Sequence, residues 1–199
     1  MKTTNEVKLG EIAKVSSGMF TKRYDAENSK NNDFPLNYYK TISNKSVEEN
    51  YINENLFENL STDRDIDSKY IAKENDIIMK LSPPYNVSII DFKKNYVIVP
   101  LNFAIIRLKK DVEFFPMYLS YLLNSYNIRK QLSRLVEGSG IQVMKISHVK
   151  EIKVKKIAIS KQKKYAKLFS LLNERKKLMK RKFEVEEILS ENIINQLNN

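Results

Sequence analysis

The stretch KQKKYAKLFSLLNERKKLMKRKFEVEEILSENIINQLNN, residues 161–199, contains neither glycine nor proline over its 39 residues. A continuous α-helix of this length would extend for about 58 Å, because each helical residue adds about 1.5 Å. The remaining 160 residues are too few to cover such a helix along its whole length. We therefore expect a long helix that projects from the rest of the chain.

Apolar side chains recur along this predicted helix at intervals close to seven residues, which is typical of a helix that packs against another helix. Basic clusters at residues 175–177 and 180–182 interrupt the apolar stripe. An amphipathic helix lying on its own domain is the simpler alternative, but it would leave much of the stripe bare. We interpret residues 161–199 as a helix for dimerisation and subunit assembly. The side chains expected to make the contact are Leu168, Leu172, Met179, Phe183, Leu189 and Ile193.

The first 160 residues contain short segments rich in β-branched and aromatic residues, separated by turns, and such segments predict strands. Apolar residues at helical spacing predict two helices, over residues 117–124 and 128–136, the first of them preceded by Pro116. Residues 7–18 are predicted to form an apolar turn and a Ser-Gly loop. The fold class is therefore α+β: a compact mixed α/β domain over residues 1–160, followed by the long C-terminal coiled-coil helix. The predicted strands are residues 36–42, 76–81, 87–91, 96–99, 103–108 and 153–159.

The chain is basic, with 35 Lys and Arg residues against 24 Asp and Glu residues, a formal charge of +11. The charge is unevenly distributed: residues 46–76 hold nine acids and three bases, whereas residues 129–164 hold eleven bases and two acids. This asymmetry indicates that one face meets an anionic partner, and nucleic acid is the first candidate. The alternative is a lysine-rich surface that only keeps the protein soluble.

Composition excludes several classes of enzyme. Without cysteine there are no disulfides, thiolate metal sites or cysteine nucleophiles, and the single histidine, His148, is expected to be structural or at the surface. The four glycines form neither a P-loop nor a Rossmann fingerprint. Asp63, Asp65 and Asp67 lack the glycine and the terminal Glu of an EF-hand, so a solvated acidic turn is expected. No apolar run approaches about 18 residues, and we predict a cytoplasmic protein without membrane contact, metal or cofactor.

Several short motifs follow one another along the chain in a defined order. They are LGEI at residues 9–12 with Ser17-Gly18 beyond it, NDII at residues 75–78, Gly138-Ser139 with Ile146-Ser147, and Gln162. This order resembles the specificity subunit of type I restriction-modification enzymes over nearly the whole chain. Each motif is short, so their order, their spacing and the terminal helix carry the resemblance. Asn75 stands where that family often has a glycine.

The resemblance implies a target recognition domain over residues 1–160 that binds double-stranded DNA. Full subunits of the family have two recognition domains and two long helices, whereas this chain has one of each. It therefore resembles a half-subunit, which implies a homodimer, or pairing with another half-subunit, to read a bipartite DNA site. It also implies a non-catalytic role that directs separate methyltransferase (modification) and restriction subunits.

Three loops are the candidate DNA-binding elements. Arginine and lysine side chains hold phosphates, and Asn and Gln can pair with adenine. For any single residue, surface charge is the simpler explanation, but the resemblance places DNA contacts on such connecting loops. The candidates are Lys22 and Arg23 in the first loop, Lys80, Ser82, Tyr85 and Asn86 in the second, and Gly138, Ser139, Gln142 and Lys145 in the third.

Two rival functions remain open. One is a protein-interaction adaptor without DNA binding, and the other is the recognition module of a related DNA methyltransferase. Ser82-Pro83-Pro84-Tyr85 is close to the Asn-Pro-Pro-aromatic tetrad of base methyltransferases, but Ser82 replaces the required amide, so we predict no catalysis. The sequence periodicity favours core packing over base stacking for the tyrosines, which are Tyr38, Tyr39, Tyr118, Tyr121 and Tyr126.

Overall fold

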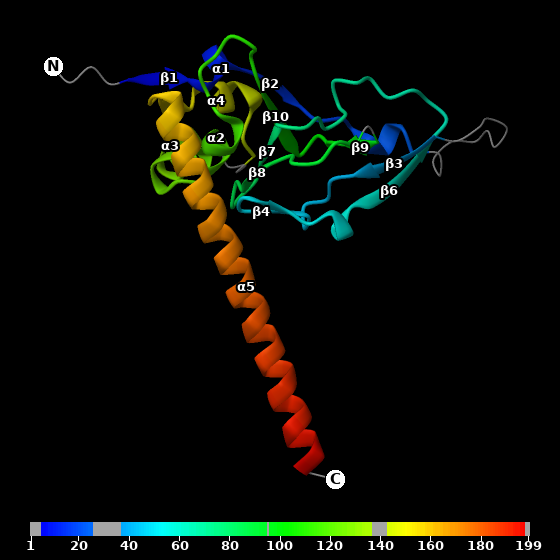
Figure 1. Cartoon of the computed structure of the whole chain (residues 1–199). Coiled ribbons are helices and arrows are strands. Elements are labelled where there is room, and N and C mark those ends of the chain that lie inside the picture. The colour runs from blue at the N-terminus through cyan, green and yellow to red at the C-terminus, as the bar shows by residue number, and fades with distance from the viewer. Residues whose placement is uncertain (1–4, 26–36, 95, 137–142, 198–199) are drawn as a thin grey trace.

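A computed structural model describes residues 5–25, 37–94, 96–136 and 143–197 of the chain (Figure 1). It has two parts: a mixed helix and sheet domain, and one long helix, α5 (Ile159–Leu197), that projects from it. The α+β class and the long C-terminal helix are thereby confirmed. The helix begins two residues earlier than the sequence predicts.

The centre of the domain is a four-stranded antiparallel sheet in the order β2-β10-β7-β8. Its strands are β2 (Ala13–Ser17), β10 (Phe103–Leu108), β7 (Ile77–Lys80) and β8 (Val87–Ile89). In β10, Ala104 lies opposite Ser17 of β2 and Phe103 lies opposite Lys80 of β7. The chain therefore leaves β2 and β7 at the same end of the sheet.

Both faces of this sheet are buried, which explains why β7 and β10 are apolar at almost every position. Ile77 and Met79 face the helices α1 (Leu9–Ile12), α2 (Pro116–Leu123), α3 (Tyr126–Val136) and α4 (Ile146–Glu151). Ile78 and Ile105 face the opposite side, where they pack with residues of the smaller sheets. Successive strand residues point to opposite faces, so one strand serves both cores.

Three smaller sheets complete the domain. The strands β6 (Glu58–Thr62), β3 (Asn37–Thr41) and β9 (Val97–Ile98) form one of them, and β4 (Val47–Glu48) and β5 (Tyr51–Ile52) form a hairpin. The strands β1 (Glu6–Lys8) and β11 (Lys153–Lys155) pair antiparallel and join the beginning of the domain to its end. Two short 3-10 helices are η1 (Thr21–Arg23) and η3 (Glu54–Leu56).

The predictions for residues 7–18 and 153–159 are wrong in part. Residues 6–17 form β1, α1 and β2 rather than a turn and a loop, because Ala13 and Val15 alternate with Lys14 and bury one face of a strand. The loop begins at Gly18, where a Cβ atom would lie 2.1 Å from the Pro100 carbonyl oxygen. The final strand stops at Lys155 rather than at residue 159.

The NDII motif forms the tight entry to β7. Asn75 has a positive φ of 70°, a conformation that glycine and asparagine adopt most easily, so asparagine suits this turn as glycine would. Asp76 is buried and binds Arg107 through two hydrogen bonds, Nε to Oδ1 at 2.7 Å and Nη2 to Oδ2 at 2.6 Å. The hydrogen bond that Arg107 donates to the Asp76 carboxylate raises the pKa of the Arg107 guanidinium. The motif is therefore structural.

The helix α5 changes character along its length. Gln162 and Ala166 are fully buried against the domain, and α5 packs on α2 there. From residue 174 to residue 197 every side chain is exposed except Glu184, which is half-buried. No helix in the described part of the chain combines the length and the apolar character that a membrane crossing requires.

Candidate nucleic-acid interface

The first two predicted loops, and the described end of the third at Met144 and Lys145, lie at one end of the central sheet. The first follows β2 and the second joins β7 to β8, and the strand register places both exits at this end. The third is tied to the second, since the Met144 backbone N–H donates to the Leu81 carbonyl oxygen at 2.7 Å. Of the third-loop candidates, Gly138, Ser139 and Gln142 lie outside the described residues.

The first loop presents two adjacent cations. Lys22 and Arg23 lie on η1 and are exposed, and neither forms an ion pair with a described residue. The Arg23 guanidinium lies over the Phe20 ring, 5.4 Å from its centroid. This contact orients the arginine but leaves its hydrogen-bond donors available for a phosphate or a guanine edge.

The second loop is more buried than the sequence predicts. Tyr85 has a φ of 57° and packs against the core, and burial raises the pKa of its hydroxyl. Ser82 and Asn86 are half-buried, and desolvation lowers the pKa of the half-buried Lys80 ammonium. The exposed tip of the turn consists of Pro83 and Pro84, which are joined by a cis peptide bond. Tyr85 therefore anchors this turn, and the prolines are its most accessible part.

Arg129 supports the second loop through hydrogen bonds. Its guanidinium donates to the Pro84 carbonyl at 3.1 Å, to the Asn124 carbonyl at 3.2 Å and to Glu49 Oε2 at 3.1 Å. Arg129 belongs to the basic segment 129–164, for which the sequence predicts an anionic partner. Its guanidinium, however, forms hydrogen bonds to other residues of the domain. Net charge along the chain did not distinguish such an internal contact from a free cation.

Sequence reasoning missed two asparagines at the same end of the sheet. Asn102 and Asn44 are exposed, and Asn102 Nδ2 donates to Asn44 Oδ1 at 2.7 Å. The Asn102 carbonyl accepts from the Leu81 N–H at 3.0 Å, next to the second loop. Exposed amides of this kind can read adenine. Lys145, the N-cap of α4, is also exposed near this loop.

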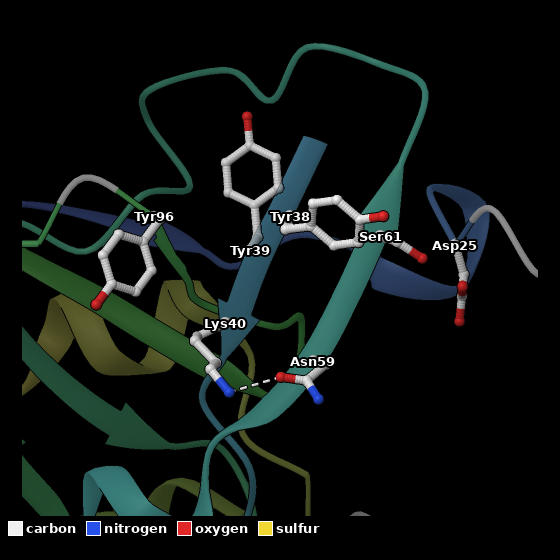
Figure 2. Close-up of a pocket in the computed structure, with 7 residues that line it drawn as sticks. All are labelled: Asp25, Tyr38, Tyr39, Lys40, Asn59, Ser61 and Tyr96. Atoms are coloured by element: carbon white, nitrogen blue, oxygen red, sulfur yellow. Dashed lines mark hydrogen bonds between the residues drawn. The ribbon is translucent and has the colours of Figure 1, made fainter. Parts of the chain in front are cut away.

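The sheet β6-β3-β9 carries a hollow of about 670 Å³ with tyrosines on its walls (Figure 2). Tyr38 and Tyr96 are 76% and 45% exposed, and Lys40 Nζ donates to Asn59 Oδ1 at 2.6 Å across the two strands. The hollow also includes Asp25, two residues beyond η1, so it adjoins the first loop. Flat aromatic rings beside a cation and an amide are chemically suited to nucleotide contacts.

The prediction that the tyrosines pack in the core is wrong for Tyr38 and Tyr126, which are 76% and 77% exposed. Tyr39 packs beside Leu60 and Ile98, so its neighbour Tyr38 faces the opposite side of the strand, towards solvent. The prediction is right for Tyr118, which is buried. An apolar and polar alternation alone did not show which of two adjacent tyrosines faces inward.

The acidic and histidine motifs offer no reactive centre. Asp67 forms an ion pair with Lys69 at 2.8 Å, and Asp65 is exposed. A hydrogen bond from Lys69 lowers the pKa of Asp67. His148 is half-buried within α4. In the described part of the chain, no group of three or more His, Cys, Asp or Glu side chains could hold a metal ion.

Comparison with known proteins finds similarity in structure only. No protein-family model matches the sequence, and no curated protein matches it. The HsdS subunit from Thermoanaerobacter tengcongensis superposes with a TM-score of 0.64 at 16% identity, over 91% of this chain and 45% of that one. A chain from a structure on complex assembly and conformational transition of the type I R-M system gives 0.58 at 11% identity, over 91% and 41%.

A third structure, the type I restriction-modification S subunit from M. genitalium, gives a TM-score of 0.53 at 17% identity, over 88% of this chain and 41% of that one. The chain therefore has the fold expected from its sequence motifs, that of type I specificity subunits. It spans less than half the length of each of these three chains.

Proposed function

We propose that this protein is a DNA-sequence-recognition subunit of a type I restriction-modification system, in a half-subunit form. The observation that carries the proposal is the joint match of domain and projecting helix to HsdS, over 91% of this chain but 45% of that one. The proposed division is a target recognition domain over residues 1–160 and an assembly helix over residues 161–199. The first turns of α5 belong structurally to the domain, since Gln162 is buried in it.

DNA contact is assigned to the sheet end where the three loops meet. In this proposal Lys22, Arg23 and Lys145 hold phosphates, and the turn from Ser82 to Asn86 approaches a groove. Lys80 and Tyr85 support that turn from within. Gly138, Ser139 and Gln142 remain candidates on the sequence alone. The exposed amides of Asn44 and Asn102 add base-reading groups to the same surface.

The arm, defined as residues 174–197 of α5, is assigned to pairing with a second copy of this chain. Four of the six side chains predicted for the contact lie in it, namely Met179, Phe183, Leu189 and Ile193, and each is about half exposed or more. Leu168 and Leu172 precede it and are 50% exposed. Residues 175–182 are strongly basic, whereas residues 184–191 contain acids and no bases. Antiparallel pairing would place the basic block of one chain against the acidic block of the other.

Catalysis is assigned to separate methyltransferase and restriction subunits, with this chain supplying the target specificity and binding no cofactor of its own. Assembly of this kind takes place in the cytoplasm, where these subunits meet the DNA. The rival adaptor function would use the same exposed arm but would not require free cations on the loops.

Two measurements test the proposal. Light scattering should give twice the monomer mass of 23.4 kDa, and a monomer would point to a different half-subunit as the partner. Binding to duplex DNA should weaken with salt, with a log-log slope of about −0.9 for each neutralised phosphate. A protein that dimerises but shows no salt-dependent binding to any duplex, alone or with the methyltransferase, would be an adaptor.

A further inference from the structure

The helix α5 meets the domain at two places, of which the first runs from Gln162 along α2, where Ala166 is buried and the Phe169 ring lies 5.4 Å from the Tyr121 ring. At the first, the buried Gln162 amide donates to the Glu113 and Ile157 carbonyl oxygens at 2.9 and 2.7 Å. Its oxygen accepts from the Phe115 N–H at 2.9 Å. With all its hydrogen bonds to backbone, Gln162 fixes the beginning of the helix. This first contact covers only the first third of α5, so the direction of the longer remaining part also depends on contacts further along the helix.

The second contact lies further along the helix, at the β4–β5 hairpin. Asn173 Nδ2 donates to the Asn50 carbonyl oxygen at 3.2 Å, and Lys177 Nζ lies 3.7 Å from the centroid of the Tyr51 ring. Asn50 and Tyr51 are adjacent in the hairpin, so two successive turns of α5 contact the same corner of the hairpin. We call Asn50, Tyr51, Asn173 and Lys177 the latch.

The hairpin corner is itself fixed to the central sheet. Asn50 has a φ of 57°, and its N–H donates to the Val87 carbonyl at 2.9 Å. Its side-chain oxygen accepts from Asn124 Nδ2 at 2.7 Å, and Asn124 is buried and bonded to both backbone groups of Val87. The latch therefore joins α5 to the edge strand β8 through a chain of short, mostly buried contacts.

We infer that the latch sets the direction of the arm, and through it the spacing between the two DNA half-sites that a pair of these chains recognises. The four latch residues are positioning residues, and because Asn50 is bonded to Val87, the residue after Asn86 of the second loop, the test changes only Asn173 and Lys177 on the helix side. The spacing part of this inference rests on the proposed function, whereas the effect on the direction of the arm does not.

Because α5 is long, a small change in its direction displaces its free end by a large distance. Leu197 lies 35 residues beyond Gln162, or about 52 Å at 1.5 Å per residue. A swing of about 10° around Gln162 would displace the end of α5 by about 9 Å, which matches between two and three base pairs at about 3.4 Å each. The latch lies between this pivot and the free end, where it opposes such a swing.

The direction of the arm can be measured without DNA. The chain has no cysteine, so Ser68→Cys in the domain and Ser190→Cys in the arm provide unique spin-label sites. Double electron–electron resonance gives the distribution of distances between the two spin labels. Diluting labelled chains with unlabelled ones restricts the measurement to distances within one chain. Asn173→Ala with Lys177→Ala removes the helix side of the latch. Asn192→Ala with Lys164→Ala makes the same two changes at exposed positions of α5, outside the latch and the basic block, and serves as the matched control.

We expect a narrow distribution for the unmodified chain and for the control, and a distribution broadened by several ångströms for the latch variant. Circular dichroism should show equal helix content in all three. An unchanged distribution in the latch variant would overturn the inference, because the first contact would then suffice to direct the helix.

A second readout uses bipartite DNA with spacers of different lengths, bound by the protein in complex with its methyltransferase. The unmodified chain and the control should lose at least about tenfold in affinity when the spacer changes by two base pairs. The latch variant should lose less than about threefold over the same change. Equal dependence of affinity on spacer length in all three proteins would refute the spacing role. Absence of DNA binding in all three would refute the proposed function instead. The direction of the arm would then still be tested by the distance distributions.

Discussion

The domain and the arm use the same apolar residue types in opposite ways. In the domain, Ile77, Ile78 and Ile106 are completely buried, whereas in the arm Ile193 and Ile194 are 49% and 57% exposed. Within the domain, both faces of the central sheet find other elements of the same chain to cover them. Beyond its contact at Lys177 the arm extends past the domain, and its side chains are exposed apart from the half-buried Glu184. The comparison teaches that the domain covers its own core, whereas the arm leaves an apolar stripe exposed, which the proposed pairing would cover.

The largest effect should be on the free energy of unfolding, when an isoleucine is replaced by alanine in the domain rather than in the arm. Ile106→Ala should lower the free energy of unfolding of the domain by about 2–5 kcal/mol, because it leaves a cavity between β10 and the helices. Ile193→Ala should change it by less than about 0.5 kcal/mol. Urea unfolding followed by tyrosine fluorescence compares the two. Equal losses would mean that the arm is part of the domain core.

The next effect concerns the arm alone. Phe183→Lys should weaken self-association at least about tenfold, since it places a charge in the proposed contact. Asn192→Lys adds the same charge at a polar position and should have a smaller effect. Sedimentation equilibrium measures both dissociation constants. Should the two variants dissociate equally, net charge rather than the apolar stripe would control pairing.

A third prediction concerns the salt dependence of DNA binding, to which the cations of the first loop should contribute and those of α5 should not. Replacing Lys22 and Arg23 by alanine should reduce the slope of log affinity against log salt by about 1.8, or about 0.9 for each lost phosphate contact. Replacing Lys176 and Lys180 in α5 removes the same charge and should leave the slope unchanged. Fluorescence anisotropy with a duplex gives both slopes. A similar fall in both variants would show that DNA responds to total charge and not to the loops.

The smallest effect should come from ion pairs along the arm. Arg181, which is exposed, and the half-buried Glu184 are 3.7 Å apart, and ion pairs that water reaches contribute little to stability. Glu184→Gln should change the stability of the helix by less than about 0.5 kcal/mol in the monomer. Thermal melting followed by circular dichroism at low concentration tests this. A large loss of helix would mean that the arm stabilises itself and does not depend on a partner.

The sequence predicted α5 and three of the four central strands, β7, β8 and β10, because each depends on a local pattern, whereas it predicted a loop in place of β2. The absence of glycine and proline over residues 161–199 marks one helix, and the apolar runs at residues 76–81 and 103–108 mark strands buried on both faces. The strands β4, β5 and β6 were not predicted. They lie in the acidic segment 46–76, where few apolar residues reveal their alternation.

The candidate site was harder to predict, because it depends on contacts between distant segments. The convergence of the first and second loops follows from the register of β2 and β7 on β10, which no local pattern contains. For the same reason the sequence did not distinguish the internally bonded Arg129 from Arg23, which contacts Phe20 but forms no ion pair with a described residue. Asn102 carries no sequence signal beyond its place in a turn.

The exposed arm also has a consequence for the lifetime of the unpaired chain. A helix without a partner opens locally far more often than one in a core, and proteases cut such segments first. The arm offers many sites for trypsin-like cleavage in fully exposed positions, whereas pairing would cover the adjacent apolar stripe. Limited digestion therefore reports assembly directly, and unassembled copies would be degraded faster than assembled ones. The clustered cleavage sites are Arg175, Lys176, Lys177, Lys180, Arg181 and Lys182.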